Sequence, residues 1–252
     1  MVSLDRGKLS IRGDREILIP VTHLSYQGMR ILAMNKFFWP DISSALEKKY
    51  LGCEDCKANS ISHHDKAYQV VPEGLILLAP GEQISIDFCS YNNQNILMVK
   101  DRVSGLIWGK LTKNQTSDEA FRGVMEWAYH VGIPHKCRSD GGGSFSSRFT
   151  NMLKEVGINH VHTSPYNSKS NGDCERSARS LKDCLKRDKI KKVTQQKIDE
   201  LTYHLNQHTQ DESGSAAERF FGRSPRSCLP NSLTRFVDQT KLLESRKAKQ
   251  VE

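Results

Sequence analysis

The strongest constraint on the fold is a run of three strand-like segments in the middle of the chain. Segments 84–89, 95–101 and 106–111 are rich in β-branched and apolar residues, and short turn-forming pairs, Asn-Asn and Ser-Gly, separate them. Turns this short join neighbouring antiparallel strands. The sequence therefore predicts an antiparallel meander, which is the start of a sheet.

A helix is predicted directly after the meander. Thr116 and Glu119 have the spacing of a capping box, and Gly132 ends the helical pattern. The apolar residues between them recur at helical spacing and define a buried stripe: Phe121, Val124, Met125 and Ala128. A further strand, 135–140, would then return beside the first by a helical crossover, which makes the two strands parallel neighbours.

The remaining pattern completes an α/β fold. A second helix with inward-facing Phe149 and Leu153 precedes a last strand at 160–162, and another helix follows Gly172. Two more amphipathic helices lie within 195–222. This order of elements predicts an RNase H-like mixed five-stranded sheet flanked by helices.

Three acidic residues fall where this fold brings distant segments together. Asp87 interrupts the apolar alternation of the first strand, Asp140 ends the returning strand just before three glycines, and Glu175 opens a helix. Hard divalent ions such as Mg²⁺ bind carboxylate oxygens and keep several waters. Two such ions about 4 Å apart activate the attacking oxygen and stabilise the leaving oxygen in phosphodiester transfer. The competing interpretation is three unrelated surface acids.

The sequence around these acids resembles the integrase catalytic core of retroviruses and LTR retrotransposons, above all the gypsy-type elements. The similarity is carried by Ile84-Ser85-Ile86-Asp87-Phe88, Val99-Lys100-Asp101-Arg102-Val103-Ser104, Gly132-Ile133-Pro134, Arg138-Ser139-Asp140-Gly141-Gly142, Thr163-Ser164-Pro165-Tyr166 and Ser170-Asn171-Gly172-Asp173-Cys174-Glu175-Arg176. Asp87 and Asp140 are separated by 52 residues and Asp140 and Glu175 by 34, where the family usually has 35 in the second interval.

The resemblance implies an enzyme that trims the 3′ end of element DNA and joins it to target DNA. It implies two ions of Mg²⁺ or Mn²⁺, one held by Asp87 and Asp140 and the other by Asp87 and Glu175. It also implies a homo-oligomer acting on two DNA ends, in the nucleus when the target is chromosomal DNA.

Two sets of residues are candidates for DNA contact. By resemblance, Tyr166 and Asn171 belong to a loop beside the active site that touches the DNA end. By helical spacing, Arg179, Lys182 and Lys186 share the helix face of Glu175, where they would bind DNA phosphates. The competing interpretation of the second set is an ordinary solvated charged face.

A zinc site is a further candidate near the amino terminus. Cys53 and Cys56 have the spacing of a structural zinc site, which needs four ligands. In the resembling family two histidines precede the cysteine pair; this sequence has His23 at the first position and Tyr26 at the second. The candidate ligands are therefore His23, Cys53 and Cys56, with His63 or His64 as a substitute fourth ligand.

Composition favours an intracellular nucleic-acid-binding protein. The net charge is +8, and residues 176–252 carry 17 Lys and Arg against 10 Asp and Glu, a difference of +7. Such an excess suits a polyanionic partner. Seven cysteines with one close pair argue against a secreted disulfide framework. The sequence shows no apolar run long enough for a membrane span and no signal-peptide pattern, so no membrane partner is expected.

These signals divide the chain into an N-terminal hairpin (1–20), a degenerate zinc-finger-like helical domain (21–62), a linker (63–79), the catalytic core (80–230) and a charged tail (231–252). The leading hypothesis is a retrotransposon-type integrase. Two rivals stay open: a co-opted or degenerate integrase-derived protein that binds nucleic acid without catalysis, and a simple metal-dependent nuclease of the same fold. The intact acids favour an enzyme, whereas Tyr26 favours the co-opted protein.

Overall fold

The structure, a computed structural model, describes residues 2–5, 8–11, 15–18, 26, 30, 33–34, 41–54, 79–162, 172–208 and 214–225. Near the amino terminus lie three antiparallel strands, β1 (Val2–Asp5), β2 (Lys8–Ile11) and β3 (Arg15–Leu18), in the order β1-β2-β3. The predicted hairpin thus has a third strand. Among the described residues that follow, helix α2 (Ile42–Leu51) packs against Tyr26 and buries Leu46 against Ala33.

The central sheet has five strands in the order β6-β5-β4-β7-β8. They are β4 (Gln83–Tyr91), β5 (Gln94–Asp101), β6 (Ile107–Thr112), β7 (Lys136–Ser139) and β8 (Asn159–His162). The first three form the predicted antiparallel meander, and β7 pairs with β4 in parallel, as does β8 with β7. The prediction of a mixed five-stranded sheet is confirmed.

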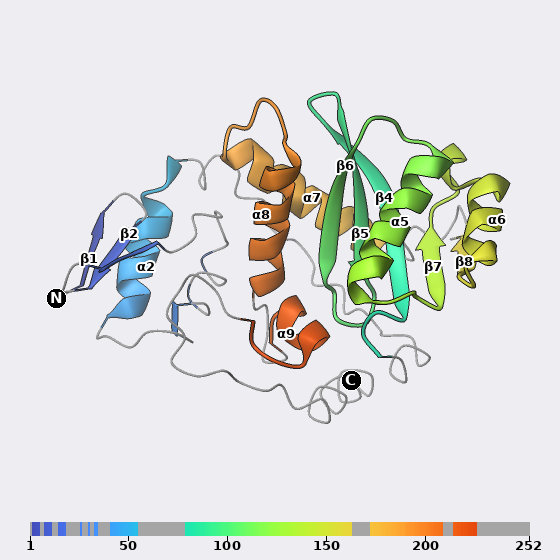
Figure 1. The fold of residues 1–252 in the computed structure, drawn as a ribbon. Helices are drawn as coiled ribbons and strands as arrows, with labels where there is room; N and C mark the ends of the chain where they lie inside the picture. Colours follow the sequence, from blue (N-terminus) through green and yellow to red (C-terminus); the bar gives the residue numbers. More distant parts are fainter. Residues whose placement is uncertain are drawn as a thin grey trace.

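Helices cover both faces of this sheet (Figure 1). The helical elements are α5 (Ser117–Val131), the 3₁₀ turn η1 (Gly143–Phe145), α6 (Ser147–Glu155), α7 (Gly172–Arg187), α8 (Gln195–Gln207) and α9 (Ala216–Phe221). One buried cluster joins α5 and α6 to the sheet, and a second joins α7 and α8 to it. The core is therefore two apolar layers on either side of one sheet.

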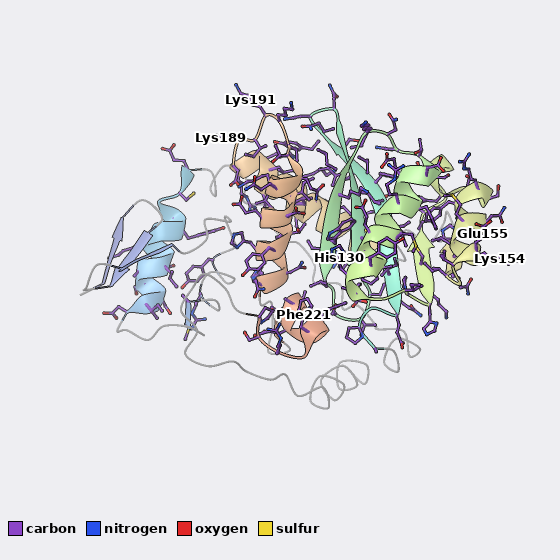
Figure 2. All side chains as sticks on the ribbon, viewed as in Figure 1. His130, Lys154, Glu155, Lys189, Lys191 and Phe221 are labelled. Atoms are coloured by element: carbon purple, nitrogen blue, oxygen red, sulfur yellow. The ribbon has the colours of Figure 1, made fainter. Side chains whose placement is uncertain are left out.

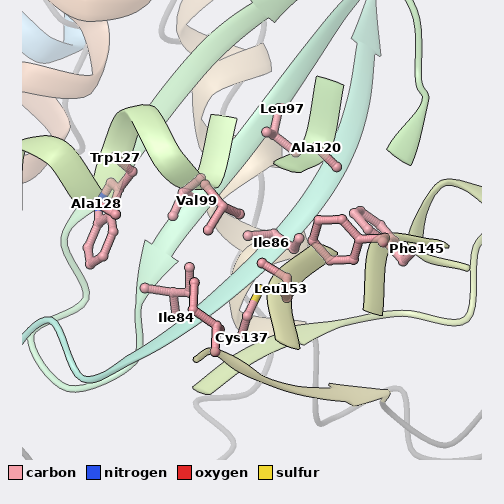
Figure 3. Packing of buried hydrophobic residues seen from close by; sticks show 13 residues of the cluster. Ile84, Ile86, Leu97, Val99, Ala120, Trp127, Ala128, Cys137, Phe145 and Leu153 are labelled. Carbon is pink, nitrogen blue, oxygen red and sulfur yellow. The ribbon is translucent and has the colours of Figure 1, made fainter. Parts of the chain in front are cut away.

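The alternation of strand side chains assigns each residue to one of these layers. Ile84 and Ile86 of β4 are fully buried on the α5 side, beside Leu97 and Val99 of β5 (Figure 3). On the other side, Cys89 packs with residues of α7. Burying each large aliphatic side chain contributes about 1.5–3 kcal/mol, so both layers stabilise the sheet.

Glycines let helices approach the sheet closely on both sides. On α5, a side chain at Gly123 would collide with Leu97 of β5. On β6, a Cβ at Gly109 would lie 2.6 Å from Cγ2 of Ile198 on α8. Neither separation is possible for real atoms, so larger residues at these two positions would push the helices away from the sheet.

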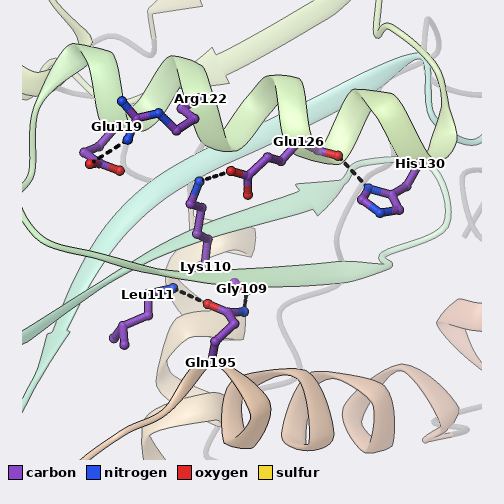
Figure 4. A network of polar contacts seen from close by, with 8 residues as sticks. All are labelled: Gly109, Lys110, Leu111, Glu119, Arg122, Glu126, His130 and Gln195. Atoms are coloured by element: carbon purple, nitrogen blue, oxygen red, sulfur yellow. Dashed lines mark hydrogen bonds and ion pairs between the residues drawn. The ribbon is translucent and has the colours of Figure 1, made fainter.

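Helix α8 also covers the outer edge of β6, the last strand on that side of the sheet. The Gln195 side chain accepts from the Leu111 N–H at 2.7 Å and donates to the Gly109 carbonyl at 2.9 Å (Figure 4). Asn206 makes the same pair of bonds with Ile107, at 2.8 and 2.7 Å. Two side-chain amides therefore take the place of a neighbouring strand, which keeps this edge from pairing with another chain.

Helix α5 is fixed at its start and along its length. The Thr116 side chain accepts from the Glu119 N–H at 3.3 Å, which is the capping contact predicted from the sequence. Farther along, Glu126 forms an ion pair with Lys110 of β6, and its carbonyl contacts the His130 ring at 2.7 Å (Figure 4). The ion pair with Lys110 ties the helix to the edge of the sheet that α8 covers.

No helix within the described ranges is long and apolar enough to cross a membrane.

Candidate active site

Two of the three predicted carboxylates come from adjacent parallel strands. The register pairs Ile84 with Cys137 and Ser85 with Arg138. Extending it by two residues places Asp87 beside Asp140, just past the end of β7. The charge of Asp140 acts on the Asp87 carboxyl, which agrees with this placement. The crossover through α5 therefore brings together two residues that are far apart in the sequence.

The third carboxylate comes from α7, which packs across β4 and β5. Cys174 is fully buried, and its thiol points at the carbonyl oxygens of Ser85 and Met98, at 3.7 and 3.8 Å. Glu175 is the next residue and is exposed. Its charge also acts on Asp87. The buried cysteine thus fixes the start of the helix, and Glu175 lies on the same side of the sheet as Asp87.

Burial and like charges change the acidity of Asp87. Its pKa rises from 3.8 to about 6, first because the carboxyl is buried, then because of the charge of Asp140, with a smaller contribution from Glu175. The Phe88 N–H and the charge of Lys182 oppose this rise. Burial and nearby negative charge both disfavour the ionised form of a carboxyl, which accounts for the raised pKa of Asp87.

The donor chemistry suits Mg²⁺ or Mn²⁺, because the three residues offer only carboxylate oxygens. The three carboxylates lie farther apart than the ligands of one bound ion. Within the described part of the chain, no three His, Cys, Asp or Glu side chains lie close enough to hold one ion. Asp140 is instead engaged in its own loop, where Oδ1 accepts from the Gly142 N–H at 3.0 Å. The acids share an electrostatic environment without forming a closed ligand set.

The basic stripe predicted on α7 lines a hollow on the same side of the sheet. Arg179, Lys182 and Lys186 face a space of about 620 Å³ whose other wall is the end of β4, at Ser90, Tyr91 and Asn92, with Asp183 as its one acid. The apolar residues predicted on the opposite side of the helix are buried: Ala178, Leu181 and Leu185. The stripe is therefore a built surface beside the carboxylates.

A chain of hydrogen bonds behind Asp140 was not foreseen from the sequence. The ring of His160 on β8 contacts the Ser139 hydroxyl through Nε2 at 2.9 Å and the Thr150 hydroxyl through Nδ1 at 2.8 Å. Ser139 in turn donates to the Asp140 carbonyl at 2.9 Å. Burial and the charge of His162 lower the pKa of His160 to about 4, so the ring is neutral at pH 7.

This series of hydrogen bonds links α6 and β8 to the backbone of Asp140, a predicted metal ligand. In the neutral ring, one nitrogen donates and the other accepts, so a single direction of bonds runs from Thr150 through His160 and Ser139 to Asp140. The sequence offers little indication of this role for His160. A histidine in a short strand shows no recognisable spacing to its partners, and Thr150 and Ser139 are ten and 21 residues away.

Several predicted site residues lie outside the described residues. Tyr166 and Asn171 of the loop before α7 are among them, as are the zinc candidates His23 and Cys56. Cys53 is described and half-buried. The zinc site therefore gains no support from the structure.

Tyr26, at the position of the second family histidine, has a structural role. Its ring packs against the cluster of Ala33, Ile42 and Leu46, 6.2 Å from the ring of Tyr50, and its hydroxyl donates to the Ser43 carbonyl at 3.4 Å. An apolar contact thus stands where the resembling family has a metal ligand.

The cysteines near the three acids are buried. Cys89, Cys137 and Cys174 are at most 7% exposed. Burial raises the pKa of Cys89 to about 11 and also raises the pKa of Cys137. Thiols of this kind are protonated at neutral pH, which argues against a nucleophilic role for these two.

Comparison with known proteins connects this site to retroviral polyproteins. No family model matches the chain. An uncharacterized protein of Caenorhabditis elegans is 28% identical over 90% of this chain, and the Pro-Pol polyprotein of simian foamy virus type 3 is 23% identical over 73% of it. The chain spans only 18% and 17% of the length of these two relatives.

Solved structures give the fold. The simian T-cell lymphotropic virus intasome, in complex with PP2A regulatory subunit B56 gamma, aligns with a TM-score of 0.54 at 19% identity, over 84% of this chain and 76% of that chain. The chain is similar in sequence to retroviral Pol polyproteins and in fold to this intasome protein. The catalytic core domain of BIV integrase also aligns, at 23% identity over 56% of this chain and 94% of that domain, but its TM-score of 0.49 is too low to add to the argument.

The predicted resemblance is confirmed in sequence by the retroviral polyproteins and in fold by the solved structure. Asp87 lies in the middle of β4, Asp140 directly follows β7, and Glu175 lies in the first turn of α7. The roles of the individual residues remain predictions.

Proposed function

We propose that this chain is the catalytic part of a retrotransposon-type integrase that processes DNA 3′ ends and joins them to target DNA. The observation that carries the proposal is the raised pKa of Asp87, about 6, caused by its burial and by the charges of Asp140 and Glu175. A carboxyl whose pKa is raised by burial and by neighbouring charges is typical of sites that bind cations or transfer protons.

The chemistry follows from the residues. Asp87 and Asp140 would hold one Mg²⁺ or Mn²⁺ ion and Asp87 and Glu175 a second, and the ions would supply Lewis acidity to the phosphodiester. Arg179, Lys182 and Lys186 in the hollow would hold phosphates of the DNA end. The chain Thr150–His160–Ser139 would keep the backbone at Asp140 in place.

Partners and place of action are part of the proposal. The basic residues of the hollow would bind phosphates of duplex DNA, both element ends and target, and the similarity to an intasome protein supports a homo-oligomer. Action on chromosomal DNA would occur in the nucleus. A structural zinc ion held by His23, Cys53 and Cys56 is not proposed, since the structure gives it no support.

The test is one assay with labelled duplex ends in Mg²⁺ or Mn²⁺, run with the wild type, Asp140→Asn and a matched control, Glu155→Gln, an exposed acid on α6. We expect shortened and joined products from the wild type and the control, and none from Asp140→Asn. Cleavage without joining would replace the proposal by the simple nuclease.

The second candidate is the co-opted protein that binds nucleic acid without catalysis. Tyr26 favours it, because this residue packs in an apolar cluster where the resembling family has a zinc ligand. DNA binding equal in EDTA and in Mg²⁺, with no product, would decide for this candidate.

A further inference from the structure

The turn that joins α7 to α8 is fastened to the hairpin between β4 and β5. The Asn92 side chain donates to the carbonyls of Ile190 and Lys191, each at 3.2 Å. Gln94 exchanges two bonds with the backbone of Val193, at 3.0 and 2.6 Å. Four bonds to side chains nearly a hundred residues away hold this turn in one conformation.

Lysines project from the turn. Lys191 and Lys192 are exposed, and Figure 2 shows Lys189 and Lys191 pointing outward at the end of the molecule where this turn lies. The one acid in the turn, Asp188, is paired with Lys197 of α8 at 2.8 Å, and its side chain is only 18% exposed. The exposed charge of the turn is therefore positive.

The turn continues the basic hollow away from the carboxylates. Asn92, which fastens the turn, also lines the hollow opposite Lys186. From Glu175 to Lys186 the helix advances eleven residues, or about 16 Å at ~1.5 Å per residue. Duplex DNA rises ~3.4 Å per base pair, so the distance from Glu175 to the far end of the hollow corresponds to about five base pairs.

We propose that Lys191 and Lys192 form a second phosphate-binding surface, which contacts duplex DNA about six or more base pairs from the reacting end. This surface, the lysine turn, comprises residues 189–192. The inference rests on the proposed function in taking DNA as the ligand, and it assigns contacts beyond the three residues of the hollow. Because the turn is fastened in advance, little ordering of the protein is needed on binding.

The experiment measures binding in EDTA, so that catalysis plays no part. Hairpin DNA with stems of about 5 and about 16 base pairs is titrated with the full chain over a range of salt, since each phosphate contact adds ~0.9 to the salt slope. We expect Lys191→Gln/Lys192→Gln to lose roughly tenfold in affinity for the long stem at ~0.1 M salt, with a slope smaller by about 2. The loss for the short stem should be several times smaller.

The matched control is Lys136→Gln/Lys154→Gln, which removes the same charge from exposed positions at the start of β7 and on α6. It should bind both stems as the wild type does. Equal losses in the two double variants, or equal losses on the two stems, would overturn the inference.

A third variant tests the fastening itself. Asn92 has a φ of 46°, so Asn92→Gly keeps this conformation while removing the side-chain amide. We expect weaker binding of the long stem with an unchanged salt slope, because every lysine remains. If the protein is catalytically active but the lysine substitutions leave DNA binding unchanged, only this inference is contradicted. If the substitutions weaken DNA binding but the wild type yields no product, only the proposed enzymatic function is contradicted.

Discussion

The two faces of strand β4 differ in what they carry. Toward α5 it presents Ile84 and Ile86, both fully buried in an apolar layer. Toward α7 it presents Ser85, Asp87 and Cys89, of which Asp87 is a half-buried carboxyl with a raised pKa. Successive residues of one strand thus serve stability on one side and the candidate chemistry on the other.

The loss of folding stability caused by the candidate site is therefore confined to one face of the strand. A buried carboxyl beside two others destabilises the fold in the absence of a cation. The apolar layer under α5 offsets this cost without sharing any residue with the site. Four predictions test how separate the two faces are.

The largest effect is expected for Asp87→Asn on activity. Removing one carboxylate ligand removes several kcal/mol of transition-state stabilisation, which is at least about a hundredfold in rate. The measurement is product yield in the labelled-end assay. Retention of more than a tenth of the wild-type rate would mean that Asp87 is no ligand.

The next effect concerns the other face. Ile86→Ala should lower the free energy of unfolding by about 2–5 kcal/mol, because it leaves a cavity in a tightly packed layer. Denaturant unfolding gives this value, and Tyr129→Ala, at a side chain 78% exposed, is the control. A loss no larger than that of the control would contradict the assigned layer.

Asp87→Asn should also change stability, in the opposite direction. The folded pKa of about 6 lies above the unfolded value of 3.8, so the folded protein binds more protons and stability falls as pH rises between these values. In EDTA at pH 7 the variant should be about 1–2 kcal/mol more stable than the wild type, after allowance for solvent screening.

The pH series sharpens this comparison. The advantage of the variant should vanish below pH 3.8, where Asp87 is protonated in both states. Mg²⁺ should stabilise the wild type more than the variant. A variant less stable than the wild type in EDTA at pH 7 would show that Asp87 is not strained by its neighbours.

The smallest effect is expected where the two faces meet. The His160 ring packs edge-on to Phe149 of the apolar layer, with centroids 5.0 Å apart, while its nitrogens reach toward Asp140 through Ser139. Thr150→Val removes one bond of this chain and should cost about 1 kcal/mol of stability and less than tenfold in activity. Thr150→Ser, which keeps the hydroxyl, should restore both stability and activity. If it does not, the hydrogen bonds from Thr150 to Asp140 do not have the proposed role.

Much of the site was accessible from the sequence because it depends on local periodicity. The alternation around Asp87, the glycines after Asp140 and the helical spacing from Glu175 to Lys186 each fix a residue's place within one element. The parallel pairing of β4 with β7 followed from the handedness of crossovers.

What the sequence missed depends on contacts between distant segments. Gln195 completes the edge of β6 from 84 and 86 residues away, and Asn92 fastens a turn 98 and 99 residues farther along. A single amide in a sequence carries no sign of its partner. The same holds for His160, whose role is visible only beside Ser139 and Thr150.

By itself the sequence determined the order of strands and helices and the five-stranded sheet, since these follow from side-chain periods of 2 and 3.6 residues and from chain handedness. The tertiary structure alone decided how strongly Asp87 is perturbed, which wall closes the basic hollow and where the lysine turn is fastened. Burial, charge coupling and hydrogen bonding act through space, so they depend on neighbours that the order of residues does not reveal.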